Sequence, residues 1–235
     1  MYSGYYYGYD PTYILVLVGA LLCMLAQWRV QSTYSKFARV LTRSGLTGAR
    51  AAAMILENNH IRDVRIEHIS GNLTDHFDPG KRVVRLSDAT YGSASLAAVA
   101  VAAHECGHVC QHQTKYIPLA IRTAIVPLAN IGSHVGLPLI MIGLLFGMNE
   151  KLIQIGIWAF SLAVLFQLVT LPVEFNASRR AITMLKDYGM LSSDELPGAK
   201  QVLGAAALTY VAGAASSVMQ LLRLMLLFGG NRRRD

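Results

Sequence analysis

The chain has 235 residues, of which 53% are hydrophobic and only 15% charged, and its formal net charge is +7. Soluble domains carry about 25% charged residues, so this composition argues against an ordinary soluble domain and also excludes an intrinsically disordered chain. Three cysteines do not make a disulfide scaffold. Lys and Arg border apolar runs instead of forming one basic stripe, which favours contact with anionic lipid and predicts no nucleic-acid partner.

Four long stretches contain no Asp, Glu, Lys or Arg: residues 11–28, 123–149, 152–173 and 201–222. About 20 mostly apolar residues cross a bilayer as a helix, so each stretch is a candidate span. The first is expected to be an uncleaved anchor, because residues 1–10 lack the basic residues of a signal peptide. The second and third predict a helical hairpin, with kinks or breaks in its first arm at Pro127, Gly136 and Pro138. The fourth is rich in small residues and predicts either a span or a buried or interfacial helix.

Basic residues predict the orientation of these spans. Five of them follow the first stretch and none precedes it: Arg29, Lys36, Arg39, Arg43 and Arg50. The positive-inside rule therefore places residues 29–122 in the cytoplasm, and the hairpin returns residues 174–200 to the same side. A fourth crossing would export the arginines at 232–234, against the rule.

The region between the first and second spans has the patterns of a small folded domain. Thr47 can cap a helix that runs through Asn59, and residues 64–69 alternate as a strand does. Residues 73–77 and 83–87 flank the turn-forming series D-P-G-K, which predicts a β-hairpin. Ser93 or Ser95 can then cap an Ala- and Val-rich helix that ends near Gln113.

The motif that indicates chemistry is His-Glu-Cys-Gly-His at residues 104–108. On a helix, His104 and His108 lie one turn apart on the same face, so two imidazoles can bind one ion. Glu105 lies beside them, where it can take a proton from water without binding the ion. Metal-assisted hydrolysis needs this arrangement, and it predicts Zn²⁺ as the cofactor with Glu105 as general base. Gly107 can admit a close neighbour, because it lacks a side chain.

Catalytic zinc needs a third protein ligand and an open coordination position. A metzincin extension is excluded, because Gln111 and Thr114 stand where its glycine and third histidine would be. His112 lies about 12 Å along the helix from His104, too far to share an ion comfortably. His134, within an apolar span, is a possible ligand, but a polar group bonded inside a helix bundle is the more common role. Glu174 is the better candidate, because it ends the third span at the expected face of the zinc helix.

Residues near the candidate ligands are candidates for supporting roles in the site. Ser178, one turn after Glu174, can orient a ligand, and Arg179 or Arg180 can pair with Glu174 or with a developing oxyanion. Cys106 and Cys110 are expected to be buried small residues and not ligands.

Asp75, His76 and Asp78 form a separate polar cluster. A second metal site or a role at the edge of a substrate site is one interpretation. A polar turn with Asx-type hydrogen bonds is the other, and it is favoured.

Four segments together resemble the bacterial neutral zinc metallopeptidase family: L-T-D-H-F-D-P at 73–79, V-V-R-L-S at 83–87, V-A-A-H-E-C-G-H at 101–108 and E-F-N-A-S-R-R-A at 174–181. The resemblance covers nearly the whole chain. It implies a mainly α, polytopic helical membrane protein with a gluzincin-like zinc protease core and a small β-hairpin element. The last segment is also similar to the glutamate-ligand helix of CAAX-prenyl-type membrane proteases, whose pattern is E-x-x-x-D, but Ser178 replaces the Asp here.

These observations predict a multi-pass zinc metalloendopeptidase of the cell membrane, with protein or peptide substrates that include membrane proteins and with its active site at the cytoplasmic face. His104, His108 and Glu174 are the expected zinc ligands. In similar proteases an edge strand before the zinc helix binds an extended peptide, a role expected here for residues 83–87. The alternatives are a site-2-type intramembrane protease, disfavoured because no L-D-G motif occurs, and a metal-binding scaffold or transporter, disfavoured because only His134 lies deep in a span.

The expected organisation has five regions: the N-terminal tail and first transmembrane helix (1–28), the cytoplasmic protease region (29–122), the transmembrane hairpin (123–173), the cytoplasmic region with the Glu174 ligand (174–200), and the C-terminal transmembrane or membrane-associated helix with its basic tail (201–235).

Overall fold

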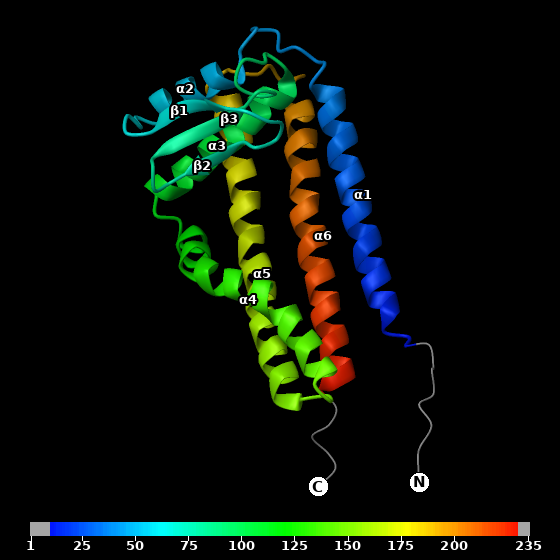
Figure 1. The fold of residues 1–235 in the computed structure, drawn as a ribbon. Helices are drawn as coiled ribbons and strands as arrows, with labels where there is room; N and C mark the ends of the chain where they lie inside the picture. Colours follow the sequence, from blue (N-terminus) through cyan, green and yellow to red (C-terminus); the bar gives the residue numbers. More distant parts are fainter. Residues whose placement is uncertain (1–9, 230–235) are drawn as a thin grey trace, which may run out of the picture. The chain divides into compact units, whose positions relative to one another are not determined.

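A computed structural model describes residues 10–229 as a mainly α-helical chain with one small sheet (Figure 1). The elements, in chain order, are α1 (Tyr13–Phe37), α2 (Gly48–Asn58), β1 (Arg65–Ile69), β2 (His76–Asp78), β3 (Val83–Ser87), α3 (Leu96–Gln113), α4 (Ile117–Leu145), α5 (Glu150–Asp187) and α6 (Leu196–Phe228). The predictions for the first nine residues and for the arginines at 232–234 lie outside the described residues.

Four of these helices, α1, α4, α5 and α6, are long and apolar enough to cross a membrane. The prediction of a mainly α, polytopic membrane protein with a small β element is therefore confirmed. The fourth stretch, left open between a span and an interfacial helix, lies in a continuous helix that meets the length and composition of a span. The predicted breaks in the hairpin do not occur, because α4 continues through both Pro127 and Pro138.

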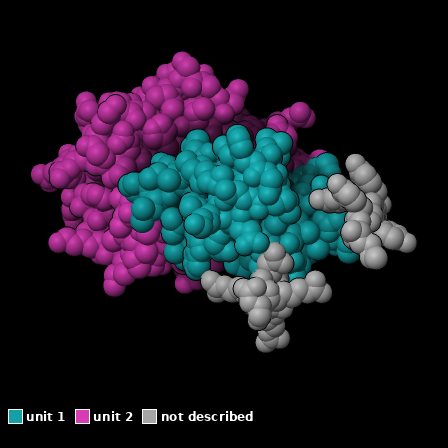
Figure 2. Space-filling view, turned by 60° about the horizontal axis from the view of Figure 1, so that its bottom comes forward, with its two compact units in different colours: residues 1–24, 127–167, 212–235 teal, residues 25–126, 168–211 magenta. Residues whose placement is uncertain are grey.

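The described residues divide into two compact units (Figure 2). The first contains residues 10–24, 127–167 and 212–229, and the second contains residues 25–126 and 168–211. In the first unit, Arg223 interrupts the apolar end of α6. Its Nη2 lies 3.1 Å from Oδ2 of Asp10, and its guanidinium lies 4.1 Å from the centre of the Tyr13 ring. These partners offset the cost of a cation in an apolar helix.

The sheet belongs to the second unit and has the strand order β1-β3-β2. β3 pairs with β1 in parallel and with β2 antiparallel, so the predicted hairpin forms between β2 and β3. The expectation that residues 83–87 form a peptide-binding edge strand is wrong. β3 is the central strand, and its main-chain groups are already paired on both sides; the edges are β1 and β2.

Capping residues set the start of both short helices of this unit. Thr47 accepts a hydrogen bond from the Arg50 amide at the start of α2, and Ser95 accepts one from the Ala98 amide at the start of α3. Ser95 is therefore the cap of the motif helix. The small side chains of α3 pack into a core with α2, β3, the end of α5 and the start of α6. This burial holds the motif helix firmly in place.

Candidate metal centre

Helices α3 and α5 bring three ligand atoms of the second unit together. Nε2 of His104 lies 3.2 Å from Nε2 of His108. Oε2 of Glu174 lies 3.3 Å from the first of these nitrogens and 3.5 Å from the second. The three atoms thus form a nearly equilateral triangle.

The dimensions of this triangle fit a zinc ion. With zinc–ligand bonds of about 2.0–2.1 Å at tetrahedral angles, ligand atoms lie about 3.3–3.4 Å apart. The Glu174 side chain is only 4% exposed, and its Oε2 is buried without a hydrogen bond in the described part of the chain. A buried carboxylate oxygen without a donor is costly unless a cation neutralises it. The donor set and its geometry therefore fit a divalent cation that prefers nitrogen and oxygen ligands.

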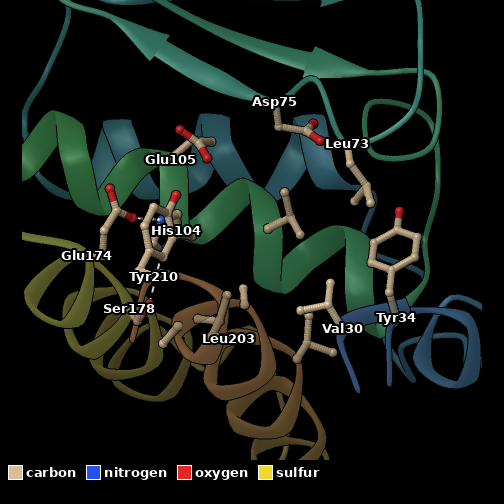
Figure 3. A pocket seen from close by; sticks show the side chains of 14 residues that line it. Val30, Tyr34, Leu73, Asp75, His104, Glu105, Glu174, Ser178, Leu203 and Tyr210 are labelled. Atoms are coloured by element: carbon tan, nitrogen blue, oxygen red, sulfur yellow. Dashed lines mark hydrogen bonds and ion pairs between the residues drawn. The ribbon is translucent and has the colours of Figure 1, made fainter. Parts of the chain in front are cut away.

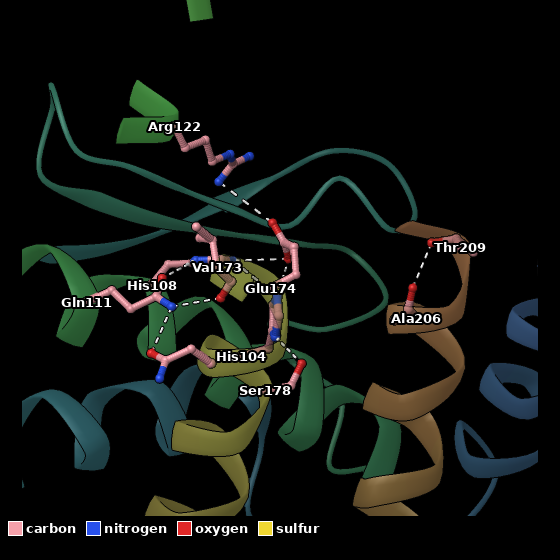
Figure 4. A network of polar contacts seen from close by, with 10 residues as sticks. His104, His108, Gln111, Arg122, Val173, Glu174, Ser178, Ala206 and Thr209 are labelled. Atoms are coloured by element: carbon pink, nitrogen blue, oxygen red, sulfur yellow. Dashed lines mark hydrogen bonds and ion pairs between the residues drawn. The ribbon is translucent and has the colours of Figure 1, made fainter. Parts of the chain in front are cut away.

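Gln111 determines which nitrogen of His108 faces the triangle (Figure 4). Its amide Nε2 donates to the carbonyl of Val173 at 2.7 Å and to Oδ1 of Asn176 at 3.0 Å. Its Oε1 is therefore left as an acceptor, 3.0 Å from Nδ1 of His108. Because Nδ1 must then carry the proton, Nε2 presents its lone pair to the triangle. Gln111 is fully buried, which keeps this arrangement fixed.

Ser178 and Arg122 contact the other two ligands. The Ser178 hydroxyl lies 3.1 Å from Nδ1 of His104, as expected for a residue that orients a ligand. Nη1 of Arg122 lies 3.7 Å from Oε1 of Glu174, the oxygen that faces away from the imidazoles (Figure 4). This ion pair limits the rotation of the Glu174 carboxylate.

The charge on Glu174 also affects His108. Burial lowers the pKa of His108, but its interaction with the Glu174 carboxylate and the nearby charge of Glu105 outweigh burial, so the net shift of its pKa is upward. In a metal site the cation takes the place of this proton.

Glu105 lines a pocket that also contains His104, Glu174, Ser178 and Tyr210 (Figure 3). Glu105 is buried, with only 8% of its surface exposed, and it lies on α3, the helix that carries both histidines. The pocket has a volume of about 160 Å³. A cavity of about 150 Å³ holds a small aromatic ring, so this pocket can take one substrate side chain. Glu105 thus has both a place beside the candidate ligands and access to a bound molecule.

The other candidate ligands do not belong to this group of ligand atoms among the described residues. His112 is exposed, and its ring contacts Phe77 at 5.8 Å between centroids. His134, also exposed, lies with its Nδ1 2.8 Å from the carbonyl of Asn130.

Neither Arg179 nor Arg180 pairs with Glu174 among the described residues. Arg179 is exposed, while Nε of Arg180 donates to Asn176 at 2.9 Å. Arg122 takes the expected role instead. No role for Arg122 was predicted from the sequence.

The two cysteines and the turn at Asp78 have the structural roles that were favoured from the sequence: buried small residues and a polar turn. Cys106 and Cys110 are buried, burial raises the pKa of the Cys106 thiol well above its usual value, and neither sulfur belongs to the group of candidate ligand atoms among the described residues. Asp78 accepts the Lys81 amide at 3.0 Å in an Asx-type turn and pairs with Arg85. Asp75 differs, because it also lines the pocket of Glu105.

Gly107 allows α3 and α5 to come close enough for Glu174 to reach the histidines. A Cβ at this position would lie 2.5 Å from the carbonyl oxygen of Ala177 on α5, so one backbone would have to move. We expect Gly107→Ala to lower the unfolding midpoint and to weaken zinc binding at least tenfold, because a shift of about 1 Å disrupts a three-ligand site. Thermal unfolding and competition with a chromophoric chelator measure both effects.

The same substitution at a position with free space is the control for this prediction. Gly204→Ala, where a Cβ would have no neighbour within 4 Å, should leave zinc affinity unchanged. Equal zinc affinity in Gly107→Ala and wild type would contradict the argument from close packing.

A buried triangle of two imidazoles and a carboxylate on apolar helices defines the class: a membrane protein with a zinc-peptidase type of site. The comparisons agree. Residues 12–229 match the family model described as "Putative neutral zinc metallopeptidase", and the chain belongs to this family. It is 46% identical over 221 residues to the "Putative membrane protease YugP" of Bacillus subtilis (strain 168), covering 94% of this chain and 98% of that protein. No solved structure matches the chain significantly.

Proposed function

We propose that this protein is a membrane-embedded, zinc-dependent metalloendopeptidase that hydrolyses peptide bonds with Glu105 as general base. The observation that supports the proposal most directly is the buried, unbonded Oε2 of Glu174 beside the two Nε2 atoms. Glu105 adjoins this cation-binding geometry in a pocket large enough for a substrate side chain. A purely structural metal site would be closed by a fourth protein ligand, whereas residues 10–229 supply three ligand atoms to this group.

Each residue of the site has a separate task in this mechanism. Zinc, when bound by His104, His108 and Glu174, supplies a Lewis acid that polarises the substrate carbonyl and lowers the pKa of water. The Glu105 carboxylate takes a proton from water as it attacks the carbonyl carbon, and then donates that proton to the leaving amine.

Three further residues maintain this geometry. Gln111 and Ser178 hold the two imidazoles in orientation. Arg122 holds the Glu174 carboxylate through its outer oxygen.

The substrate backbone has a candidate partner in β2. This strand is an edge of the sheet, and the two pocket residues Leu73 and Asp75 precede it directly. An extended peptide that pairs with the outer side of β2 would have its side chains directed towards the pocket by the period-two alternation of a strand.

The basic residues that follow the first uncharged stretch support a cytoplasmic position for the site, and the apolar helices support the bilayer as its surroundings. Substrates would then be proteins or peptides at the inner membrane surface, including membrane proteins.

Removal of the metal tests the proposal directly. The purified full-length chain in detergent is expected to contain about one zinc per chain and to cleave an unfolded protein substrate. A chelator should abolish cleavage, and stoichiometric Zn²⁺ should restore it, because polarisation of the carbonyl and the lowered pKa of water both depend on the metal. Zinc analysis and gel-based cleavage assays measure the two quantities. Cleavage that survives complete removal of zinc would refute the proposal.

A further inference from the structure

The pocket beside the candidate metal centre extends along α3 towards Tyr34 and Asp75 (Figure 3). Its walls between the two ends are apolar and come from three helices. The wall residues are Val30 of α1, Val101 of α3, and Leu203, Ala206 and Ala207 of α6. Figure 3 shows Glu174 and His104 at one end, with Asp75 and Tyr34 towards the other. A bound side chain would therefore cross apolar surface before it meets a polar end.

Asp75 is held in place by hydrogen bonds but lacks a countercharge. Its Oδ1 accepts the Ser87 amide at 2.8 Å, and its Oδ2 accepts the Ser87 hydroxyl at 2.9 Å. These two hydrogen bonds fix the direction of the carboxylate. Within the described residues, no Lys, Arg or His forms an ion pair with it.

The lack of a basic partner distinguishes Asp75 from the other acidic residues in and beside the sheet. Each of them has a basic partner: Asp63 has Arg82 at 2.7 Å, Glu67 has Arg85 at 3.4 Å, Asp78 has Arg85 at 3.1 Å, and Asp88 has His68 at 2.7 Å. The acidic side chain that faces the pocket is the exception. A carboxylate without a cation, at the end of an apolar pocket, is complementary to a ligand that brings the cation itself.

The other end of the pocket is the candidate metal centre, where a bound Zn²⁺ and Arg122 would offset the charges of Glu174 and Glu105. Asp75 is therefore the carboxylate of this pocket that has no countercharge within residues 10–229, and the apolar walls screen it less than water would. An acidic substrate side chain would meet repulsion at this end. A side chain with a long aliphatic stem and a cationic tip would match both the walls and the charge.

We propose that this pocket selects a Lys or Arg side chain of the substrate, with Asp75 binding its cationic group and the apolar walls binding its stem. This inference rests on the proposed function, because it assigns the substrate class of the same site. The buried Tyr34 hydroxyl, which makes no hydrogen bond among the described residues, offers the cationic group a second polar partner at this end.

The test uses labelled peptides of uncharged residues with one central position varied between Lys, norleucine and Glu. Norleucine keeps the aliphatic stem and removes the cation, so the ratio of the Lys to the norleucine peptide reports the charge alone. Binding is measured by fluorescence anisotropy on the full-length, zinc-loaded Glu105→Gln variant, so that the result does not depend on turnover. Cleavage of the same peptides by the chain with Glu105 intact is measured separately.

We expect the Lys peptide to bind about tenfold more tightly than the norleucine peptide and the Glu peptide to bind most weakly, because a hydrogen bond to a charged group is worth a factor of this size. Asp75→Asn, added to the same background, should bring the ratio of Lys to norleucine to within about twofold of one, since the amide keeps the size of the side chain and removes its charge. Zinc content is measured for every variant.

Asp88→Asn is the matched control. Asp88 also accepts a backbone amide, from Gly71 at 2.8 Å, but it does not line the pocket. It should therefore keep the preference for Lys. The inference fails if no peptide binds, if Lys and norleucine bind equally before Asp75 is changed, or if Asp75→Asn keeps the preference. It fails also if both Asn variants lose the preference alike. Selective binding without cleavage by the zinc-loaded chain would instead refute the proposed function and leave this inference standing.

Discussion

Glu105→Gln is expected to lower the rate of peptide cleavage by about 10²–10⁴-fold while zinc content stays at the wild-type level. The amide has the size of the carboxylate but cannot accept a proton from water at neutral pH. Glu105 does not belong to the triangle of ligand atoms, so its substitution leaves those atoms in place. Cleavage of an unfolded protein and zinc per chain, measured on the same preparation, give the two quantities.

A similar exchange on a neighbouring helix serves as the control for Glu105. Glu57→Gln changes an exposed carboxylate of α2, outside the pocket, and should leave both quantities unchanged. Cleavage by Glu105→Gln at the wild-type rate would exclude the proposed mechanism. Loss of zinc together with activity would instead show that Glu105 maintains the metal site.

Glu174→Gln is expected to weaken zinc binding by at least about 100-fold and to abolish cleavage with it. Even partners outside the ligand shell typically contribute 10–100-fold to metal affinity, and loss of a charged ligand should cost more. Arg122 would also lose its ion-pair partner. Titration against a chromophoric chelator measures the affinity. Thermal unfolding of the zinc-free protein separates loss of the ligand from loss of the fold.

The control for Glu174 lies on the same helix. Glu150→Gln changes a carboxylate in the first turn of α5 and should keep wild-type affinity. Unchanged zinc affinity in Glu174→Gln would refute the assignment of Glu174 as a zinc ligand.

Local patterns in the chain were sufficient to predict the helices, their capping residues and the β-hairpin. The uncharged stretches predict α1, α4, α5 and α6, because apolar length is a property of consecutive residues. Ser95 and the turn between β2 and β3 are likewise short-range features. The position of β3 at the centre of the sheet was not predicted. It depends on the parallel pairing with β1, which joins strands separated in the chain.

The roles of the residues around the candidate ligands likewise could not be predicted from local sequence. Gln111 follows the motif directly, yet its role depends on Val173 and Asn176 of α5. No role was predicted from the sequence for Arg122, which borders the second uncharged stretch, or for Tyr210, which lies in the fourth. Nothing in their local sequence distinguishes them, because each acquires its role from a side chain or pocket far away in the chain.

The spacing of His104 and His108 was enough to indicate a metal-binding helix, because one turn of helix places both imidazoles on the same face. The addition of Glu174 relied on a resemblance and on the expected membrane boundary. The structure brings its oxygen to within 3.5 Å of both nitrogens and leaves that oxygen without a hydrogen bond. The pocket that joins this site to Asp75 has walls from α1, α3 and α6. Its shape and charge arise only when segments far apart in the chain pack together, so no local pattern could predict them.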